Sequence, residues 1–221
     1  MKEYRYKNLQ YVVHFPEDFK LDKKYPIILL LTGAGSRGKD ISLVRSSLFF
    51  EATENFQLNT VIFAPQCYAD SWFDIFEQLI EFVEEMIHRT YVDADRVYLI
   101  GSSMGAYAVW QLAMSRPELF AAIVPICGGG MYWNAVRLKH MGVWAFHGNE
   151  DSIVLCEESQ KMVDSINRNG GSARLTIWKG VGHDSWVKTY QYQKLYEWLF
   201  RQKKSEYLPE RSLKENPEQF G

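Results

Sequence analysis

A serine flanked by glycines is the feature of this sequence with the clearest chemical meaning. Residues 101–105 read G-S-S-M-G and match the G-x-S-x-G pattern, in which a strand turns sharply into a helix and exposes a serine. The glycines leave room for the strained backbone that this turn imposes on Ser103. Apolar residues 97–100 predict a buried strand before the turn, and residues 106–114 predict a helix after it. This context favours a nucleophilic serine over an ordinary turn.

A nucleophilic serine needs a histidine to take its proton and a carboxylate to orient that histidine. Asp151 lies in a loop after the apolar run 143–146, and His183 lies in a loop after the run 173–178. Both loops follow the carboxyl end of an expected strand, which is the edge where open parallel sheets bind ligands. The order serine, acid, histidine is one of the known triad orders. We therefore expect Ser103 as nucleophile, His183 as general base and Asp151 as orienting acid.

Other acids and histidines compete for these roles. Glu150 and Asp184 are alternatives to Asp151, although Asp184 adjoins His183 and consecutive side chains usually point apart. The remaining histidines are His14, His88, His140 and His147. His147 ends an expected strand, where a hydrogen-bonded structural histidine is the expectation. Glu84 and His88 have helical i, i+4 spacing, but a single pair is weak support for a metal site, and we expect no metal.

The glycine-rich loop at residues 33–40 fits three templates. G-x-G-x-x-G matches the dinucleotide fingerprint, and G-x-x-x-x-G-K matches most of a phosphate-binding loop. The phosphate loop needs a Ser or Thr after the lysine, but Asp40 stands there. A dinucleotide site needs an acidic residue after the next strand, which instead ends at Gln66. The remaining template is a loop that offers a backbone N–H to an oxyanion, with a helix over 41–52 that Asp40 caps.

The order of apolar and amphipathic segments predicts how these loops are held. Buried strands are expected at 26–31, 60–64, 96–100, 121–126, 143–146 and 173–178, with helices at 41–52, 72–89, 106–114, 157–168 and 187–200. This alternation predicts a mostly parallel central sheet flanked by helices, within a single α/β domain over residues 1–221. Residues 4–15 suit an antiparallel edge strand or hairpin. We expect residues 202–221 to form a polar, peripheral tail.

Composition excludes several other classes of protein. The net charge is −2, so nothing drives binding to nucleic acid. No apolar run is long enough for a membrane span, and the first residues lack the apolar core of a secretory signal. Three scattered cysteines argue against a disulfide framework. We expect a soluble, cytoplasmic protein without a cofactor, and formation of a homo-oligomer stays open.

Six ordered segments together resemble the α/β-hydrolase superfamily. They are L-T-G-A-G-S-R-G at 31–38, A-P-Q-C at 64–67, G-S-S-M-G at 101–105, P-I-C-G-G at 125–129, H-G-N-E-D at 147–151 and G-H at 182–183. The similarity covers about residues 24–200. It is greatest to small single-domain serine esterases without a large lid: carboxylesterases and phospholipases, the dienelactone-hydrolase-like and polyhydroxybutyrate-depolymerase or feruloyl-esterase-like proteins, and predicted peptidases of the prolyl-oligopeptidase clan.

The resemblance implies the same triad and adds an oxyanion hole. Its donors would be the backbone N–H groups of Ala34 and Met104. One departure is that the family commonly has His-Gly where this chain has Thr32 and Gly33. The backbone donor should persist, but a side-chain role of that histidine would be lost. The implied activity is hydrolysis of carboxylic esters through an acyl-enzyme, with a serine peptidase as the alternative and a non-catalytic binding protein as a remote one.

The sequence defines the substrate less closely than it defines the chemistry of the reaction. Trp72, Trp133 and Trp186 all lie near the loops expected at the active edge of the sheet. They would suit an aromatic acyl group or a sugar ring stacked on indole, and core packing is the alternative. The segment from 128 to 141 is too short for a large lid. An open site for small or extended esters is therefore expected.

Overall fold

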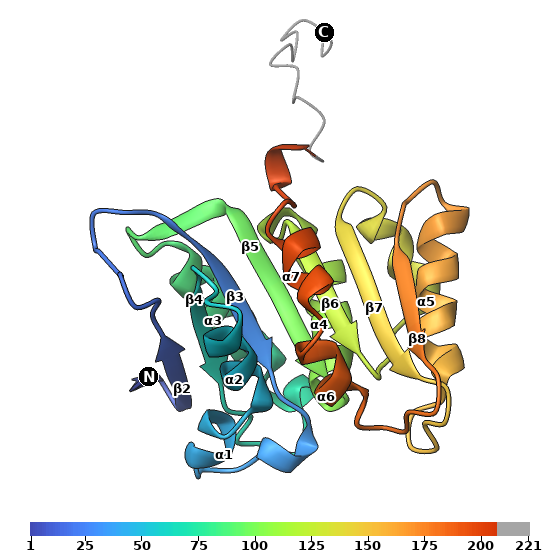
Figure 1. Cartoon of the computed structure of the whole chain (residues 1–221), viewed down its shortest axis with the longest axis horizontal. Helices are drawn as coiled ribbons and strands as arrows, with labels where there is room; N and C mark the ends of the chain where they lie inside the picture. The colour runs from blue at the N-terminus through green and yellow to red at the C-terminus, as the bar shows by residue number, and fades with distance from the viewer. Residues whose placement is uncertain (207–221) are drawn as a thin grey trace, which may run out of the picture.

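The computed structural model describes residues 1–206 and shows an eight-stranded sheet with helices on both faces (Figure 1). The strands are β1 (Lys2–Tyr6), β2 (Leu9–His14), β3 (Tyr25–Leu31), β4 (Val61–Pro65), β5 (Val92–Ser102), β6 (Ala122–Ile126), β7 (Gly142–Gly148) and β8 (Arg174–Trp178). Their order in the sheet is β1-β2-β4-β3-β5-β6-β7-β8. β1 and β2 form an antiparallel hairpin on β4, whereas β3 to β8 run parallel. The predicted α/β class, parallel core and antiparallel amino-terminal edge are confirmed.

The helices divide between the two faces of the sheet. They are α1 (Ser42–Arg45), α2 (Leu48–Asn55), α3 (Phe76–Ile87), α4 (Met104–Ser115), α5 (Cys156–Arg168), α6 (Ser185–Tyr190) and α7 (Gln193–Leu199). Short 3₁₀ helices are η1 (Ala34–Ser36), η2 (Trp72–Ile75), η3 (Pro117–Leu119), η4 (Tyr132–Leu138) and η5 (Lys204–Glu206). Buried side chains of α3, α4 and α5 belong to one hydrophobic cluster, and those of α1, α2, α6 and α7 belong to the other. Within residues 1–206, no helix is both long and apolar enough to cross a bilayer.

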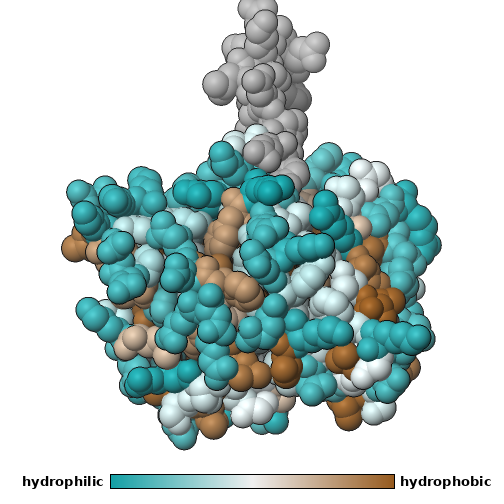
Figure 2. All heavy atoms as spheres, in the orientation of Figure 1, coloured by the Kyte–Doolittle hydropathy of each residue, from teal (hydrophilic) through white to brown (hydrophobic). Residues whose placement is uncertain are grey.

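Helices cover both faces of the sheet, which explains why the central strands are continuous apolar runs in the sequence. In β3, Ile27 and Leu29 enter the cluster with α3, α4 and α5, whereas Ile28 and Leu30 enter the other. Successive side chains of a strand point to opposite faces, so both sets must be apolar. Figure 2 shows the face that carries α2, α6 and α7, where hydrophilic residues predominate and apolar ones form small separate groups.

Besides the helix expected at 72–89, which is η2 followed by α3, two predicted helices are each divided in the structure. The helix expected at 41–52 is α1 followed by α2, because Ser47 leaves the helical conformation and its side chain accepts a hydrogen bond from Phe49 N. The helix expected at 187–200 is α6 followed by α7. The chain turns there so that the Tyr192 ring packs edge-on against Trp144 and Trp178. Apolar periodicity continues across both breaks and did not indicate them.

The carboxyl-terminal tail is attached to the sheet as far as the structure describes it. Ser205 donates from its N–H and its hydroxyl to the Asp95 carboxylate, each over 2.7 Å. Tyr98 Oη also donates to Gln202 O over 2.9 Å. The first part of the expected peripheral tail therefore packs on β5, and residues 207–221 lie outside the described part of the chain.

Two glycines allow α4 to lie directly against the central strands. A Cβ atom on Gly105 would lie 2.0 Å from Leu31 O of β3. A Cβ atom on Gly101 would lie 2.6 Å from Gly105 O and 2.8 Å from a methyl group of Val109. No side chain fits at such distances, so glycine is required at both positions because of close packing. This packing fixes the start of α4 at the carboxyl edge of the sheet.

We predict that Gly105→Ala destabilises the protein by several kcal/mol, because β3 and α4 must separate to admit the methyl group. Gly35→Ala is the matched control, since nothing lies within 4 Å of its added Cβ. Urea unfolding followed by circular dichroism measures both variants. Equal midpoints for the two variants would show that α4 does not depend on this close approach.

Candidate active site

Ser103 occupies a strained turn between β5 and α4. Its backbone has φ 53° and ψ −121°, a conformation that L-residues rarely adopt and that costs about 1–3 kcal/mol. Its N–H donates to Ile126 O of β6 over 2.9 Å, which fixes the turn to the neighbouring strand. The predicted elbow is thus present, and it presents the serine side chain at the carboxyl edge of the sheet.

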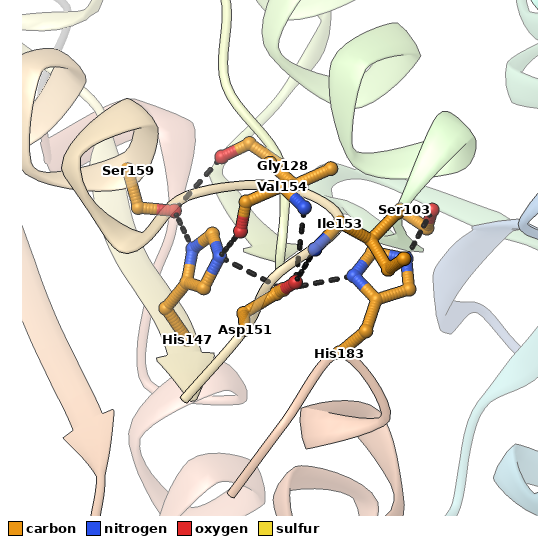
Figure 3. Close-up of polar contacts among 8 residues, drawn as sticks. All are labelled: Ser103, Gly128, His147, Asp151, Ile153, Val154, Ser159 and His183. Atoms are coloured by element: carbon orange, nitrogen blue, oxygen red, sulfur yellow. Dashed lines mark hydrogen bonds and ion pairs between the residues drawn. The ribbon is translucent and has the colours of Figure 1, made fainter. Parts of the chain in front are cut away.

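Three side chains from separate loops join in one hydrogen-bonded chain (Figure 3). His183 Nε2 lies 2.8 Å from Ser103 Oγ, and His183 Nδ1 lies 2.8 Å from Asp151 Oδ2. An ionised carboxylate only accepts, so Nδ1 carries a proton and Nε2 is free to accept the serine proton. The loops after β5, β7 and β8 therefore bring the predicted nucleophile, acid and base together. Their catalytic roles remain predictions.

The Asp151 carboxylate is buried yet held in its ionised form. Burial acts to raise the pKa of Asp151, but hydrogen bonds from His183 and the backbone of Val154 and Ile153 outweigh it, so the pKa lies below its ordinary value. Both backbone N–H groups donate to Oδ1 over 2.9 Å. The carboxylate is accordingly negative at neutral pH and can orient His183 and stabilise it when it becomes protonated.

His147 contacts the same carboxylate, which the sequence did not indicate. Its ring is fully buried, as expected of a structural histidine. His147 Nε2 lies 3.1 Å from Asp151 Oδ2 and 2.9 Å from Val154 O, so this nitrogen carries a proton. Nδ1 lies 2.8 Å from Ser159 Oγ, which lies 2.8 Å from Gly128 O (Figure 3). His147 therefore connects Asp151 to α5 and to the loop after β6.

Apart from His147, the competing acids and histidines lie outside this network. Glu150 and Asp184 are exposed, and Asp184 occupies the amino-terminal end of α6. His140 is exposed, and His88 Nδ1 contacts Glu84 O of its own helix. His14 belongs to β2, at the antiparallel edge of the sheet. The geometry thus selects Asp151 and His183 from the alternatives that the sequence left open.

The glycine-rich loop places backbone donors beside Ser103. Ala34 begins η1 and Met104 begins α4, and the first N–H of a helix has no acceptor within that helix. A Cβ atom on Gly33 would lie 3.4 Å from Ser103 Cβ, so the loop reaches the nucleophile. This arrangement suits an oxyanion hole, and that role of Ala34 and Met104 remains a prediction.

Gln66 holds the glycine-rich loop in place. Its side-chain amide is buried and donates to Ser36 O over 3.1 Å and to Asp40 O over 2.7 Å. Gly38 N adds a bond to Cys67 O over 2.8 Å. The residue that stands where a dinucleotide site would have an acid therefore fixes the loop instead.

The three tryptophans have different environments. Trp72 is fully buried, and its Nε1 donates to Thr32 O over 3.0 Å, so the prediction that it contacts substrate is wrong. Its indole packs in the core because η2 turns it inward toward β3. Trp186 is half-buried with its ring edge-on to His183, at a centroid distance of 5.6 Å. Trp133 is 68% exposed, its ring packs edge-on against Tyr132, and its contact with substrate remains a prediction.

One group of potential metal ligands overlaps the triad. Atoms of Cys127, Asp151 and His183 lie within 4.8 Å of one another. Burial raises the pKa of the Cys127 thiol to about 12, so the thiol keeps its proton. Metal binding needs a thiolate and a free imidazole nitrogen, whereas both nitrogens of His183 are already engaged. Asp151 and His183 are therefore better placed to form hydrogen bonds with each other and with Ser103 than to bind a metal together with Cys127.

The sequence comparisons match this chain to peptidases. Residues 63–140 match the model of the Prolyl oligopeptidase family. Dipeptidyl-peptidase 5 of Porphyromonas gingivalis (strain ATCC 33277) is 23% identical over 230 residues, which cover 79% of this chain and 32% of the peptidase. The chain thus spans about a third of that protein's length.

Solved structures add further similar proteins. A thermostable esterase is 31% identical, with a TM-score of 0.84 over 91% of this chain and 63% of the esterase. A ferulic acid esterase is 15% identical, with a TM-score of 0.65 over 90% of this chain and 97% of the other. Dipeptidyl peptidase 4 of Porphyromonas gingivalis is 13% identical, with a TM-score of 0.65 over 88% and 33%. The last two likenesses concern the fold alone.

We predict that His147→Leu lowers kcat at least about tenfold with little change in KM, because Asp151 loses a charge-assisted hydrogen bond. Leucine keeps the buried volume, and His147→Gln, which retains a donor, should recover part of the rate. Steady-state ester hydrolysis measures both variants.

The exposed His140→Asn is the control for these variants and should behave as the wild type. A folded His147→Leu variant with wild-type kcat would refute the role of His147 in positioning Asp151.

Proposed function

We propose that this chain, which belongs to the α/β-hydrolase superfamily, is a serine hydrolase that cleaves carboxylic esters. The observation that carries the proposal is the continuous hydrogen-bonded chain from Ser103 through His183 to the ionised Asp151. Each member has the proton arrangement that nucleophilic attack requires. The substrate is a small-molecule ester, and no step calls for a cofactor.

The reaction proceeds by acyl transfer. Ser103 Oγ attacks the ester carbonyl while its proton passes to His183 Nε2, and Asp151 stabilises the resulting imidazolium. The N–H groups of Ala34 and Met104 donate to the negative oxygen of the tetrahedral intermediate. Each donor lowers the free energy of the transition state by about 3 kcal/mol. His183 then protonates the departing alcohol, and water releases the acyl group by the reverse sequence.

Esters are preferred over peptides as the substrate class. The similarity to the thermostable esterase, at 31% identity over 91% of the chain, supports an ester hydrolase. The match to the Prolyl oligopeptidase family over residues 63–140 supports a serine peptidase as the second candidate. Both reactions use the same residues, so the choice depends on the substrate tested.

We predict that the wild type hydrolyses p-nitrophenyl acetate and that Ser103→Ala lowers kcat/KM by at least about 10³-fold, because the acyl-enzyme cannot form. The melting temperature should stay unchanged, since the side chain contributes little to packing. Turnover that persists in Ser103→Ala would refute the assignment. Higher kcat/KM for short peptide p-nitroanilides than for aryl esters would identify the peptidase.

A further inference from the structure

His183 changes hydrogen-bond partners during the proposed reaction. In the free protein its two nitrogens contact Asp151 Oδ2 and Ser103 Oγ, each over 2.8 Å. Once Ser103 Oγ carries the acyl group in place of its hydrogen, it can no longer donate to Nε2. The ring is then hydrogen-bonded through Nδ1 to Asp151 alone, although Nε2 must still meet the leaving alcohol and later the attacking water.

The backbone that leads to His183 is held against the loop that carries the acid. A Cβ atom on Gly148 would lie 2.2 Å from Val181 O and 2.3 Å from Gly182 O, so the two loops are in direct contact. Glu150 N also donates to Val181 O over 2.9 Å. These contacts keep the loop of the base beside the acid. The freedom that remains to His183 is rotation of its side chain, which is 21% exposed.

Trp186 makes a contact with the imidazole that no step of the reaction removes. The centroids of the two rings lie 5.6 Å apart and their planes are at 89°, so one ring presents its edge to the face of the other. The contact uses no hydrogen bond, and it therefore persists whether Nε2 faces Ser103, an alcohol or water. Because the planes are perpendicular, rotation of the imidazole would either bring the rings into collision or open a gap between them.

The indole is carried on a fixed element rather than on a loop. Trp186 lies in the first turn of α6, which begins beside the carboxyl ends of β6 and β7 (Figure 1). Thr189 Oγ1 donates to Ser185 O over 2.8 Å and accepts from Trp178 Nε1 of β8 over 2.9 Å. The indole also packs against the hydrophobic cluster that α6 shares with α7. A side chain with this support can restrain the imidazole.

We propose that Trp186 is a positioning residue that keeps His183 Nε2 aimed at the reacting oxygen after Ser103 has been acylated. In deacylation, the water oxygen attacks the acyl carbon while a water proton passes to Nε2. Nε2 then returns the proton to Ser103 Oγ as the bond between Oγ and the acyl carbon breaks and the carboxylic acid leaves. This step depends most on Trp186, because no serine hydrogen is present to hold the base. The role rests on the proposed ester hydrolysis, which forms the acyl-enzyme.

The test uses Trp186→Leu with p-nitrophenyl acetate and ethyl acetate, which form the same acetyl-enzyme. p-Nitrophenolate leaves without a proton, so its burst phase measures acylation and its steady rate measures deacylation. In Trp186→Leu the steady rate should fall about tenfold while the burst rate changes less than about twofold, because only deacylation lacks the serine hydrogen bond. kcat and KM for this ester should therefore fall together, and acetylated Ser103 should accumulate in the quenched reaction, as measured by intact mass.

Ethyl acetate provides a second readout. Its alkoxide needs a proton from Nε2 in order to leave, so kcat/KM for ethyl acetate relative to p-nitrophenyl acetate should fall about tenfold in Trp186→Leu. This ratio, like KM, does not depend on the fraction of folded protein. Trp186→Phe keeps a ring beside His183 and should recover most of both effects. Val187→Ala is the control, since Val187 is the next residue of α6 and is 43% exposed, and it should match the wild type.

A burst rate that falls as much as the steady rate would overturn the proposal. A raised KM for p-nitrophenyl acetate would also overturn it and would mark Trp186 as a substrate contact instead. Unchanged rate constants in Trp186→Leu would remove the positioning role while ester hydrolysis stands. A wild type that hydrolyses neither ester would refute the proposed function and this role with it.

Discussion

The buried carboxylate of Asp151 is the group on which the arrangement of the site depends. It is 5% exposed, and a charge so far removed from water persists only when hydrogen-bond donors replace the lost solvent. Ile153 N and Val154 N donate to one oxygen, and His183 and His147 lie against the other. The loop after β7 is shaped around this anion. The orientation of the base, and through it the state of the nucleophile, follows from that charge.

The sheet supplies the second constraint, because it places the loops from β5, β7 and β8 at one edge. Ser103 keeps a strained backbone there, and Gly105 allows α4 to contact β3 closely enough to hold it. Gln66 fixes the glycine-rich loop from the neighbouring β4 side. The strain at Ser103 is thus maintained by packing and hydrogen bonds that do not involve Asp151 or His183.

The sequence indicated features that depend on local pattern and chain order. Continuous apolar runs predicted the buried strands. The order of Ser103, Asp151 and His183 along the chain predicted that they would lie close together, because each follows a strand that ends at the same edge. Features that depend on tertiary contacts were missed. The contact of His147 with Asp151 requires the turn through Val154, and the burial of Trp72 requires η2 to fold back on β3. Apolar periodicity cannot distinguish a core residue from a pocket wall.

The most direct test of the central claim is the rate at which an aryl fluorophosphonate modifies the protein, followed by intact mass and peptide mapping. One label per chain is expected, placed on Ser103 and not on the adjacent Ser102, which is 7% exposed. Labelling should be at least about 10³-fold slower in Asp151→Asn, because the uncharged side chain no longer holds His183 in the accepting tautomer. Labelling elsewhere, or an equal rate in Asp151→Asn, would contradict the claim that the buried Asp151 carboxylate activates Ser103 through His183.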